Sequence, residues 1–220
     1  MLHGIDVSSH QDDTPDVSGQ KFVFVKATEG VSYVNPERDS QLATARKAGL
    51  VVGHYHFARP GDMQAQAKYF VSKADIRDGD LLAVDWEDSG VSSAQKDALL
   101  KAVKKLRPDH RVILYCNRDY WLNRDTTSYC EDGLWIADYN HEAGSPAIEH
   151  PWTFHQYTDR PVDKSVARFA TVADLRTWAA ASSSADSSAP RWRTLLDHVM
   201  AIPEKIYETW DGEEGWDNHT

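Results

Sequence analysis

Apolar runs of strand length alternate with amphipathic stretches of helix length in the first half of this 220-residue chain. The apolar periodicity predicts strands near residues 3–8, 22–27, 50–57, 81–87, 111–116, 133–138, 152–157 and 169–174. The stretches between them predict helices near residues 36–48, 62–77, 92–107 and 118–127. Eight strands are enough to close a barrel, and beyond residue 130 the strands follow one another without long helices. The pattern predicts a barrel that is β/α in its first half and mostly β in its second.

Two acidic residues stand at the end of the apolar run in the segment LLAVDWEDSG. Asp85 and Glu87 are two residues apart, so on a strand both side chains point to the same face. Carboxylate pairs of this kind serve general acid catalysis at glycosidic bonds. The same residues also suit a strand that runs out into an acidic surface loop, and this segment alone does not separate the two interpretations.

Polar side chains also follow other predicted strands. Asp6 stands near the end of the first one, the run 22–25 leads into Lys26, and the run 50–53 leads into the segment HYHF. In barrels and open α/β sheets, ligands bind at the edge where strands end and loops begin. The sequence therefore predicts a polar site at that edge.

Seven segments of the chain, taken together and in order, resemble the lysozymes of glycoside hydrolase family 25, over roughly residues 2–180. The segments are GIDVSSHQ, FVFVKATEGVSYVNP, AGLVVGHYHFARPGD, AVDWED, RVILYCN, GLWIADYN and WTFHQYTD. These enzymes are N-acetylmuramidases, and many are phage endolysins. The resemblance implies an irregular TIM-like (β/α)5(β)3 barrel and a substrate in the glycan strands of bacterial peptidoglycan. It also implies an endolysin made in the host cytoplasm that reaches the wall through a holin-made hole.

The resemblance implies roles for four acidic residues. Glu87 is the expected general acid, and Asp85 is either the nucleophile or the group that stabilises attack by the substrate's 2-acetamido group. Asp6 and Asp174 are expected to hold this pair through hydrogen bonds. The family usually closes with a Val-Asp-Leu-Asn-like strand, which we match to residues 169–176, although Arg176 stands in the asparagine position. Simpler interpretations are a turn-forming Asp6 and a helix N-cap at Asp174.

Aromatic side chains at strand ends are expected to bind sugar rings, because their flat faces stack on pyranoses and their polar tips bond hydroxyl groups. Period two puts Tyr55 and Phe57 on one face and His54 and His56 on the other, and the resemblance assigns the first pair to the substrate. The predicted substrate-binding residues are Tyr55, Phe57, Tyr115, Trp135, Tyr139, Gln156 and Tyr157.

Two other functions compete with this one. A metal-dependent barrel amidohydrolase would bind its metal through His54 and His56 together with Asp6, His10 and Asp85. A non-catalytic module would bind cell-wall glycan without hydrolysing it. The set of Asp6, Asp85 and Glu87 argues against the module, and we expect neither a metal nor another cofactor.

Composition restricts the partners. The net charge of −10 argues against nucleic acid, which requires a basic surface. No apolar run reaches 18 residues, so no membrane span is expected, and the first residues lack the basic start and apolar core of a signal peptide. Cys116 and Cys130 permit one disulfide without requiring it.

The last forty residues differ in composition from the rest. We expect a catalytic barrel over residues 1–180, a linker rich in Ser and Ala over 181–190, and an amphipathic helix with an acidic tail over 191–220. The helix is too short to hold a core by itself. Docking on the barrel or self-association through residues 191–210 is the favoured interpretation, and contact with a wall or a partner is the other.

Overall fold

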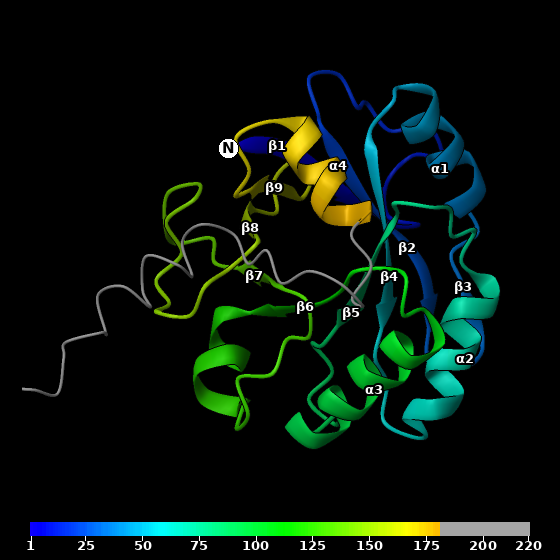
Figure 1. Ribbon diagram of the computed structural model, residues 1–220, viewed down its shortest axis with the longest axis vertical. Helices are drawn as coiled ribbons and strands as arrows, with labels where there is room; N and C mark the ends of the chain where they lie inside the picture. The colour runs from blue at the N-terminus through cyan, green and yellow to red at the C-terminus, as the bar shows by residue number, and fades with distance from the viewer. Residues whose placement is uncertain (181–220) are drawn as a thin grey trace, which may run out of the picture. The chain divides into compact units, whose positions relative to one another are not determined.

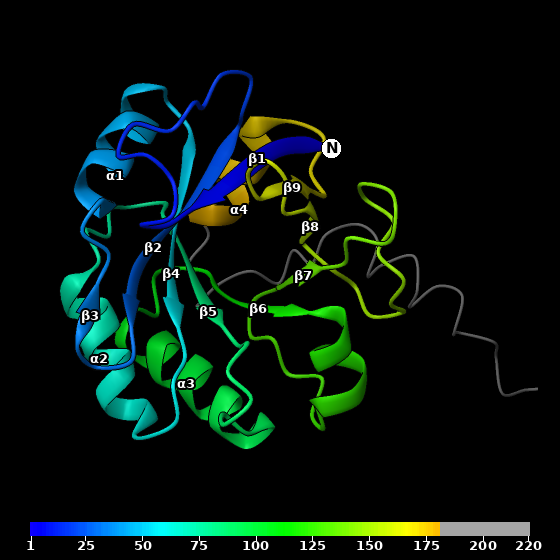
Figure 2. The ribbon, with the colours of Figure 1, turned by 180° about the vertical axis from the view of Figure 1, so that it is seen from behind.

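The computed structural model describes residues 1–180, which form a closed barrel with helices on its outer side (Figures 1 and 2). The predicted linker 181–190 and the predicted helix and tail 191–220 lie outside the described residues. Within residues 1–180, none of the helices combines the length and apolar character that crossing a bilayer requires.

The eight strands of the barrel lie close to the predicted ones, except for the last strand. They are β1 (Leu2–Val7), β2 (Phe22–Glu29), β4 (Val51–Phe57), β5 (Leu81–Asp85), β6 (Val112–Asn117), β7 (Leu134–Ala137), β8 (Phe154–Thr158) and β9 (Lys164–Ala167). A short strand, β3 (Tyr33–Val34), extends β2 as a hairpin. The helices are α1 (Arg38–Lys47), α2 (Met63–Lys73), α3 (Ser93–Leu106), the π-helix η1 (Tyr120–Arg124) and α4 (Val172–Ala180).

Pairing between the first two strands closes the barrel. Strand β1 is parallel to β2, and each further neighbour from β2 round to β8 is also parallel. Strand β9 is antiparallel to both β8 and β1. The irregular α/β barrel is therefore confirmed, with helices α1, α2, α3 and η1 in the first half and a run of strands in the second. The connection from β1 to β2 contains no helix.

The predicted last strand, residues 169–174, is wrong. The last strand is Lys164–Ala167, and helix α4 begins at Val172. A local capping signal explains the difference, because the Thr171 hydroxyl accepts from the Asp174 amide at 3.1 Å and the Asp174 carboxylate accepts from the Thr171 amide at 2.9 Å. This reciprocal pair starts a helix in a segment whose β-branched residues favour a strand.

The predicted helix 118–127 is also shorter in the structure. Helical residues begin at Arg118, as predicted, but end at Arg124, and the last five of them form η1. The Asn117 side chain accepts from the Tyr120 amide at 2.9 Å at its start, and beyond it Asp125 accepts from the buried Lys96 ammonium at 2.7 Å. That ion pair holds the chain against α3 and ends the helical turn.

The core has an inner and an outer part. Inside the barrel, Phe22, Phe24, Trp135 and Phe154 pack ring against ring, with Phe24 stacked on Trp135 at 4.2 Å between centroids. Helix α4 covers the end of this interior where the parallel strands begin, and its Trp178 ring contacts Phe154. The outer part fills the space between the strands and helices α1, α2 and α3.

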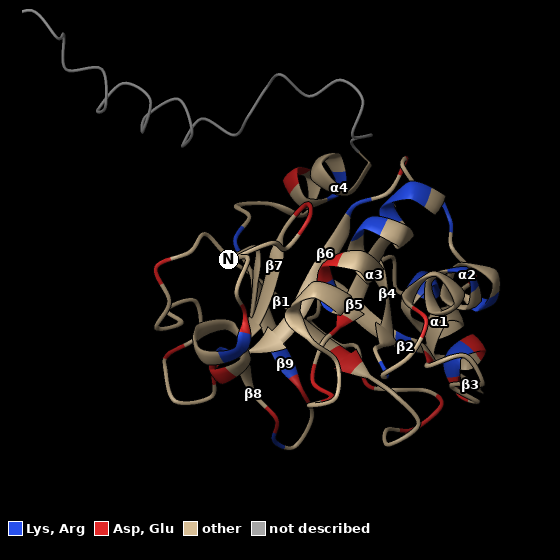
Figure 3. Ribbon diagram, turned by 90° about the horizontal axis from the view of Figure 1, so that it is seen from below, with Lys and Arg blue, Asp and Glu red and all other residues tan. Residues whose placement is uncertain are grey.

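Inward-facing side chains change from apolar to polar along each parallel strand. The inward sequence on β5 is Leu81, Ala83 and then Asp85, and β1 and β2 likewise end their inward faces in Asp6 and Lys26. Acidic residues gather on strand ends and loops around β5, β8 and β9, while many of the Lys and Arg residues lie on the outer helices (Figure 3). Closing the barrel therefore collects polar groups over an apolar floor.

We expect Gly53→Ala to lower the free energy of unfolding by about 1–3 kcal/mol, because added volume in a packed core forces side chains out of place. A Cβ atom on Gly53 would overlap the Phe24 ring. Urea denaturation measures the change, and Ser40→Ala on exposed α1 is the control. The double variant Gly53→Ala/Phe24→Leu should lose less free energy of unfolding than the sum of the losses in the two single variants. A loss equal to that sum would contradict the contact between Gly53 and Phe24.

Candidate active site

Four carboxyl groups interact with one another at the end of the barrel where the parallel strands stop. Asp6 comes from β1, Asp85 from the last position of β5, Glu87 from the segment after β5, and Asp163 from the residue before β9. Asp6 feels the charges of Asp163 and Glu87, and Asp85 feels those of Glu87 and Asp6. Strands far apart in the chain thus bring like charges together at one place.

Asp85 is a deeply buried carboxylate with one oxygen that lacks a hydrogen-bond partner. It is 5% exposed, and its Oδ1 atom is buried without a hydrogen-bond partner. Burial raises the pKa of Asp85 well above its ordinary value, and the negative charge of Glu87 raises it further. The Lys26 ammonium acts in the opposite direction. An unpartnered carboxylate oxygen is costly in a folded protein, and it is free to accept a hydrogen bond from a ligand.

Glu87 is half-buried, and its backbone is fixed from two sides. Burial raises the pKa of Glu87, with the charge of Asp163 as the next cause, while Lys26 lowers it. The Tyr120 hydroxyl on η1 donates to the Glu87 carbonyl oxygen at 2.6 Å. The preceding Trp86 is buried and donates from Nε1 to the Val91 carbonyl at 2.8 Å. These contacts fix the backbone that carries the Glu87 side chain.

Asp6 is held by a relay of hydrogen bonds. The Gln156 amide donates to Asp6 Oδ2 at 2.8 Å, and its oxygen accepts from the Tyr115 hydroxyl at 2.8 Å and the Tyr139 hydroxyl at 2.6 Å. With two hydroxyl groups donating to its oxygen, the amide must turn its NH₂ group towards Asp6. Burial nevertheless raises the pKa of Asp6 well above its ordinary value, and Asp163 adds to this.

Asp163 is the acidic residue that the sequence prediction missed, and Asp174 is not part of the cluster. Asp174 is exposed at the start of α4, which covers the opposite end of the barrel. The Asp163 carbonyl accepts from the Asp6 amide at 3.2 Å, and burial raises the pKa of the Asp163 side chain. A signal was present in the chain, because residues 162–165 read Val-Asp-Lys-Ser, which shares its Val-Asp pair with a Val-Asp-Leu-Asn strand, but residues 173–176 match that strand at just as many positions.

The predicted sugar-binding aromatics fall into two groups. Tyr55 and Phe57 lie on the inward face of β4 beside Lys26, whose ammonium is 5.0 Å from the Phe57 ring, and Tyr139 is 47% exposed. Trp135 is only 2% exposed, and its indole stacks on Phe24 and donates to Ser165. No face of Trp135 is open to a ligand, so its predicted contact with substrate is wrong.

Three more of the predicted residues occupy distinct positions. Tyr115 and Gln156 are buried and serve the relay to Asp6. Tyr157 packs its ring against His155, one residue out of phase with Gln156 on β8. The ring contact with His155 therefore places Tyr157 away from the relay that Gln156 joins.

The two histidines of the predicted metal site face the outside of the barrel. His54 Nε2 lies 2.9 Å from Asp80 Oδ2, and His56 Nδ1 lies 2.8 Å from Thr28 Oγ1. Burial lowers the pKa of His56 to about 4. The proposed grouping of these histidines with Asp85 is therefore wrong, since Asp85 points inward on the neighbouring strand. Residues 1–180 hold no cluster of three His, Cys, Asp or Glu side chains suited to a metal, and Cys116 and Cys130 are both free thiols.

The sequence profile described as glycosyl hydrolases family 25 matches residues 5–166. The chain belongs to this family. Lysozyme M1 of Streptomyces globisporus is 31% identical over 182 residues, which cover 71% of this chain and 62% of that protein. The N,O-diacetylmuramidase of Chalaropsis sp. is 35% identical over 148 residues, covering 54% of this chain and 68% of that protein. The chain spans less than two thirds of the length of the first of these relatives.

Solved structures of the family share the fold. The family 25 lysozyme of Aspergillus fumigatus superposes with a TM-score of 0.69 at 25% identity, covering 82% of this chain and 99% of that one. The muramidase of Acremonium alcalophilum gives a TM-score of 0.66 at 27% identity, covering 81% of this chain and 98% of that one. The resemblance seen in the seven sequence segments is therefore confirmed at the level of family and fold.

We expect Asp85→Asn to raise the free energy of unfolding at pH 7 by about 1–2 kcal/mol, since residues that serve a site often cost stability. The pKa of Asp85 is higher in the folded chain than in the unfolded one. Asp85 therefore contributes favourably to the free energy of unfolding below its pKa in the unfolded chain. This contribution is lost as the pH rises through its pKa in the folded chain. Urea midpoints measured from pH 7 downwards should show the variant's advantage shrinking, whereas the exposed control Asp78→Asn should show little change. An Asp85→Asn variant less stable than wild type at pH 7 would contradict this account.

Proposed function

We propose that this chain is a muramidase that hydrolyses the β-1,4 bond between N-acetylmuramic acid and N-acetylglucosamine in bacterial peptidoglycan. The observation that carries the proposal is the cluster of Asp6, Asp85, Glu87 and Asp163 at the strand ends of a family 25 barrel. The names of the relatives, lysozyme and N,O-diacetylmuramidase, support the same reaction.

Glu87 is the proposed general acid. Breaking a glycosidic bond requires a proton on the leaving oxygen, and the donor must hold that proton near neutral pH. Burial and the nearby Asp163 carboxylate favour the protonated form of Glu87, as its raised pKa reflects. Glu87 is also more exposed than Asp85, so it is the one placed to meet a substrate.

Asp85 is proposed to assist attack by the 2-acetamido group of the substrate. The unpartnered Oδ1 atom of Asp85 is available to accept the acetamido N–H, which would orient that group and stabilise the positive charge that develops on it. Direct attack by Asp85 on the anomeric carbon is the other role. Asp6, held by Gln156, and Asp163 are proposed to keep the local potential negative, and so to keep a proton on the pair.

The position of the acids also argues against the two competing functions. A metal-dependent amidohydrolase requires histidines among the inward groups, and His54 and His56 are bonded on the outer face. A module that only binds glycan gains nothing from burying several carboxylates together, because each costs desolvation energy. Hydrolysis requires the raised pKa values that this burial produces.

A role in phage lysis is the finer part of the proposal. The lysozyme of Streptococcus phage Cp-7 is 26% identical to this chain over 184 residues, which supports such a role. Expression in a bacterial host should then cause lysis when a holin is co-expressed. Unchanged culture density under those conditions, with active enzyme in the extract, would contradict the phage role while leaving the muramidase proposal intact.

We expect Glu87→Gln to lower the rate of glycan hydrolysis by about 10²–10⁴-fold, because a positioned general acid contributes that much. Mass spectrometry of digested peptidoglycan, after borohydride reduction, should show reduced muramic acid ends with wild type and very few with the variant. Equal yields would remove Glu87 from its role. New free amino termini in place of reducing ends would identify an amidase or peptidase and contradict the proposal.

Asp163 and Asp174 form a matched pair for testing the site. Asp163→Asn removes a charge that keeps Glu87 protonated, so kcat/KM should fall by about 10-fold or more at pH 7 and its alkaline limb should move to lower pH. Asp174→Asn changes only the cap of α4 and should leave kcat/KM within about 2-fold of wild type. A larger loss of kcat/KM in Asp174→Asn than in Asp163→Asn would contradict this assignment and return Asp174 to the catalytic cluster.

A further inference from the structure

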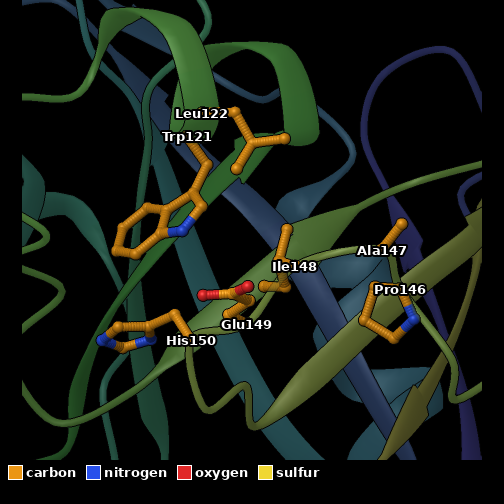
Figure 4. A pocket seen from close by; sticks show the side chains of 7 residues that line it. All are labelled: Trp121, Leu122, Pro146, Ala147, Ile148, Glu149 and His150. Atoms are coloured by element: carbon orange, nitrogen blue, oxygen red, sulfur yellow. The ribbon is translucent and has the colours of Figure 1, made fainter.

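The barrel has a recess that is lined by none of the four acidic residues and is used by none of the proposed catalytic steps. It has a volume of about 520 Å³ and lies between η1 and the segment that leads from β7 to β8 (Figure 4). Both segments start at strand ends on the same side of the barrel as Asp85 and Glu87. The recess is lined by Trp121, Leu122, Pro146, Ala147, Ile148, Glu149 and His150.

The lining of this recess is mostly aliphatic. Leu122 is 47% exposed, although it is a large apolar side chain. Trp121 is only 8% exposed, and the His150 ring packs against it with centroids 4.9 Å apart, so little of its face is free for a sugar. Pyranose rings bind to open aromatic faces, whereas this surface suits alkyl groups.

One charged group stands in the lining. Glu149 is exposed, and among residues 1–180 its carboxylate has neither an ion pair nor a hydrogen bond. In Figure 4 this carboxylate lies near Trp121 and His150, beside Ile148. An unpaired carboxylate next to aliphatic side chains is complementary to a ligand that carries an ammonium group on an alkyl chain.

The walls of the recess are tied to the catalytic segment. Arg118, just before η1, donates from Nε to the Ala147 carbonyl at 2.8 Å, which joins η1 to the opposite wall. Tyr120, within η1, donates to the Glu87 carbonyl. One wall of the recess is therefore joined through Tyr120 to the backbone of the segment that carries Glu87.

We propose that this recess binds the peptide stem of peptidoglycan, with the alkyl chain of its diamino acid against Leu122 and Ile148 and the side-chain ammonium paired with Glu149. The inference rests on the proposed function, because the peptide is carried by the muramic acid of that substrate. Every muramic acid that retains its stem presents alanine methyl groups and a diamino acid beside the glycan. The aliphatic lining and the single carboxylate correspond to these two features.

The first test compares two forms of one substrate. Peptidoglycan with lysine-containing stems is assayed intact, and again after an amidase has removed the stems from the glycan. In the double variant Leu122→Ser/Glu149→Gln, the KM for the intact form should be about 5- to 20-fold higher than in wild type. Its preference for intact over stripped glycan, measured as the ratio of the two kcat/KM values, should fall by the same factor. Glu142→Gln, which changes an exposed carboxylate in the same β7–β8 segment outside the recess, is the control and should keep the wild-type preference.

The second test does not depend on turnover. The peptide L-Ala-γ-D-Glu-L-Lys-D-Ala is titrated into the full chain carrying Glu87→Gln, and the indole N–H signal of Trp121 is followed by NMR. A saturable shift that Glu149→Gln weakens several-fold supports the proposal. The absence of a shift in the Trp121 signal would overturn the proposal. So would the kinetic result that the double variant raises KM equally on intact and stripped glycan. Failure of the proposed function would show separately, as wild type that releases no reducing muramic acid ends from either substrate.

Discussion

Closure of the barrel is the constraint on which the site depends. The parallel pairing of β1 with β2 joins the first strand to the one after it, while β9 joins β1 to β8. Every inward side chain then shares one interior, with aromatic rings at the floor and polar groups at the strand ends. In the sheet opened between β1 and β2, four strands would separate Asp6 on β1 from Asp85 on β5, yet in the closed barrel the charge of Asp6 acts on Asp85.

The acidic cluster shows how a fold uses an unfavourable arrangement. Burial raises the pKa values of Asp6, Asp85, Glu87 and Asp163, and repulsion within the cluster raises those of the first three further. The chain therefore gives up stability near neutral pH to keep a proton available. Neutral donors restrain the cluster: Gln156 holds Asp6, and Tyr120 and Trp86 hold the backbone around Glu87. Lys26 is the cation that opposes the rise, and its own ion pair with Glu29 at 2.7 Å limits that opposition.

The errors of the sequence interpretation have a common origin. Apolar and aromatic patterns locate strands, but they do not show how deep in a barrel each residue lies. Trp135 and Tyr139 both belong to the segment GLWIADYN, yet one is part of the floor and the other is 47% exposed. Asp163 and Asp174 follow similar local patterns at the end of the chain, and a capping pair with Thr171 placed Asp174 on a helix at the wrong end of the barrel.

The sequence by itself determined the class of fold, the family, and the alternation that points Asp85 and Glu87 the same way, because periodicity and local motifs are properties of neighbouring residues. It also contained Asp6 and Asp163 without showing that they would meet. Only the tertiary structure decided which acids share the interior, which aromatics stay open, and that η1 and the β7–β8 segment enclose a recess. Those outcomes depend on strand register and barrel closure, which bring together residues that no local pattern relates.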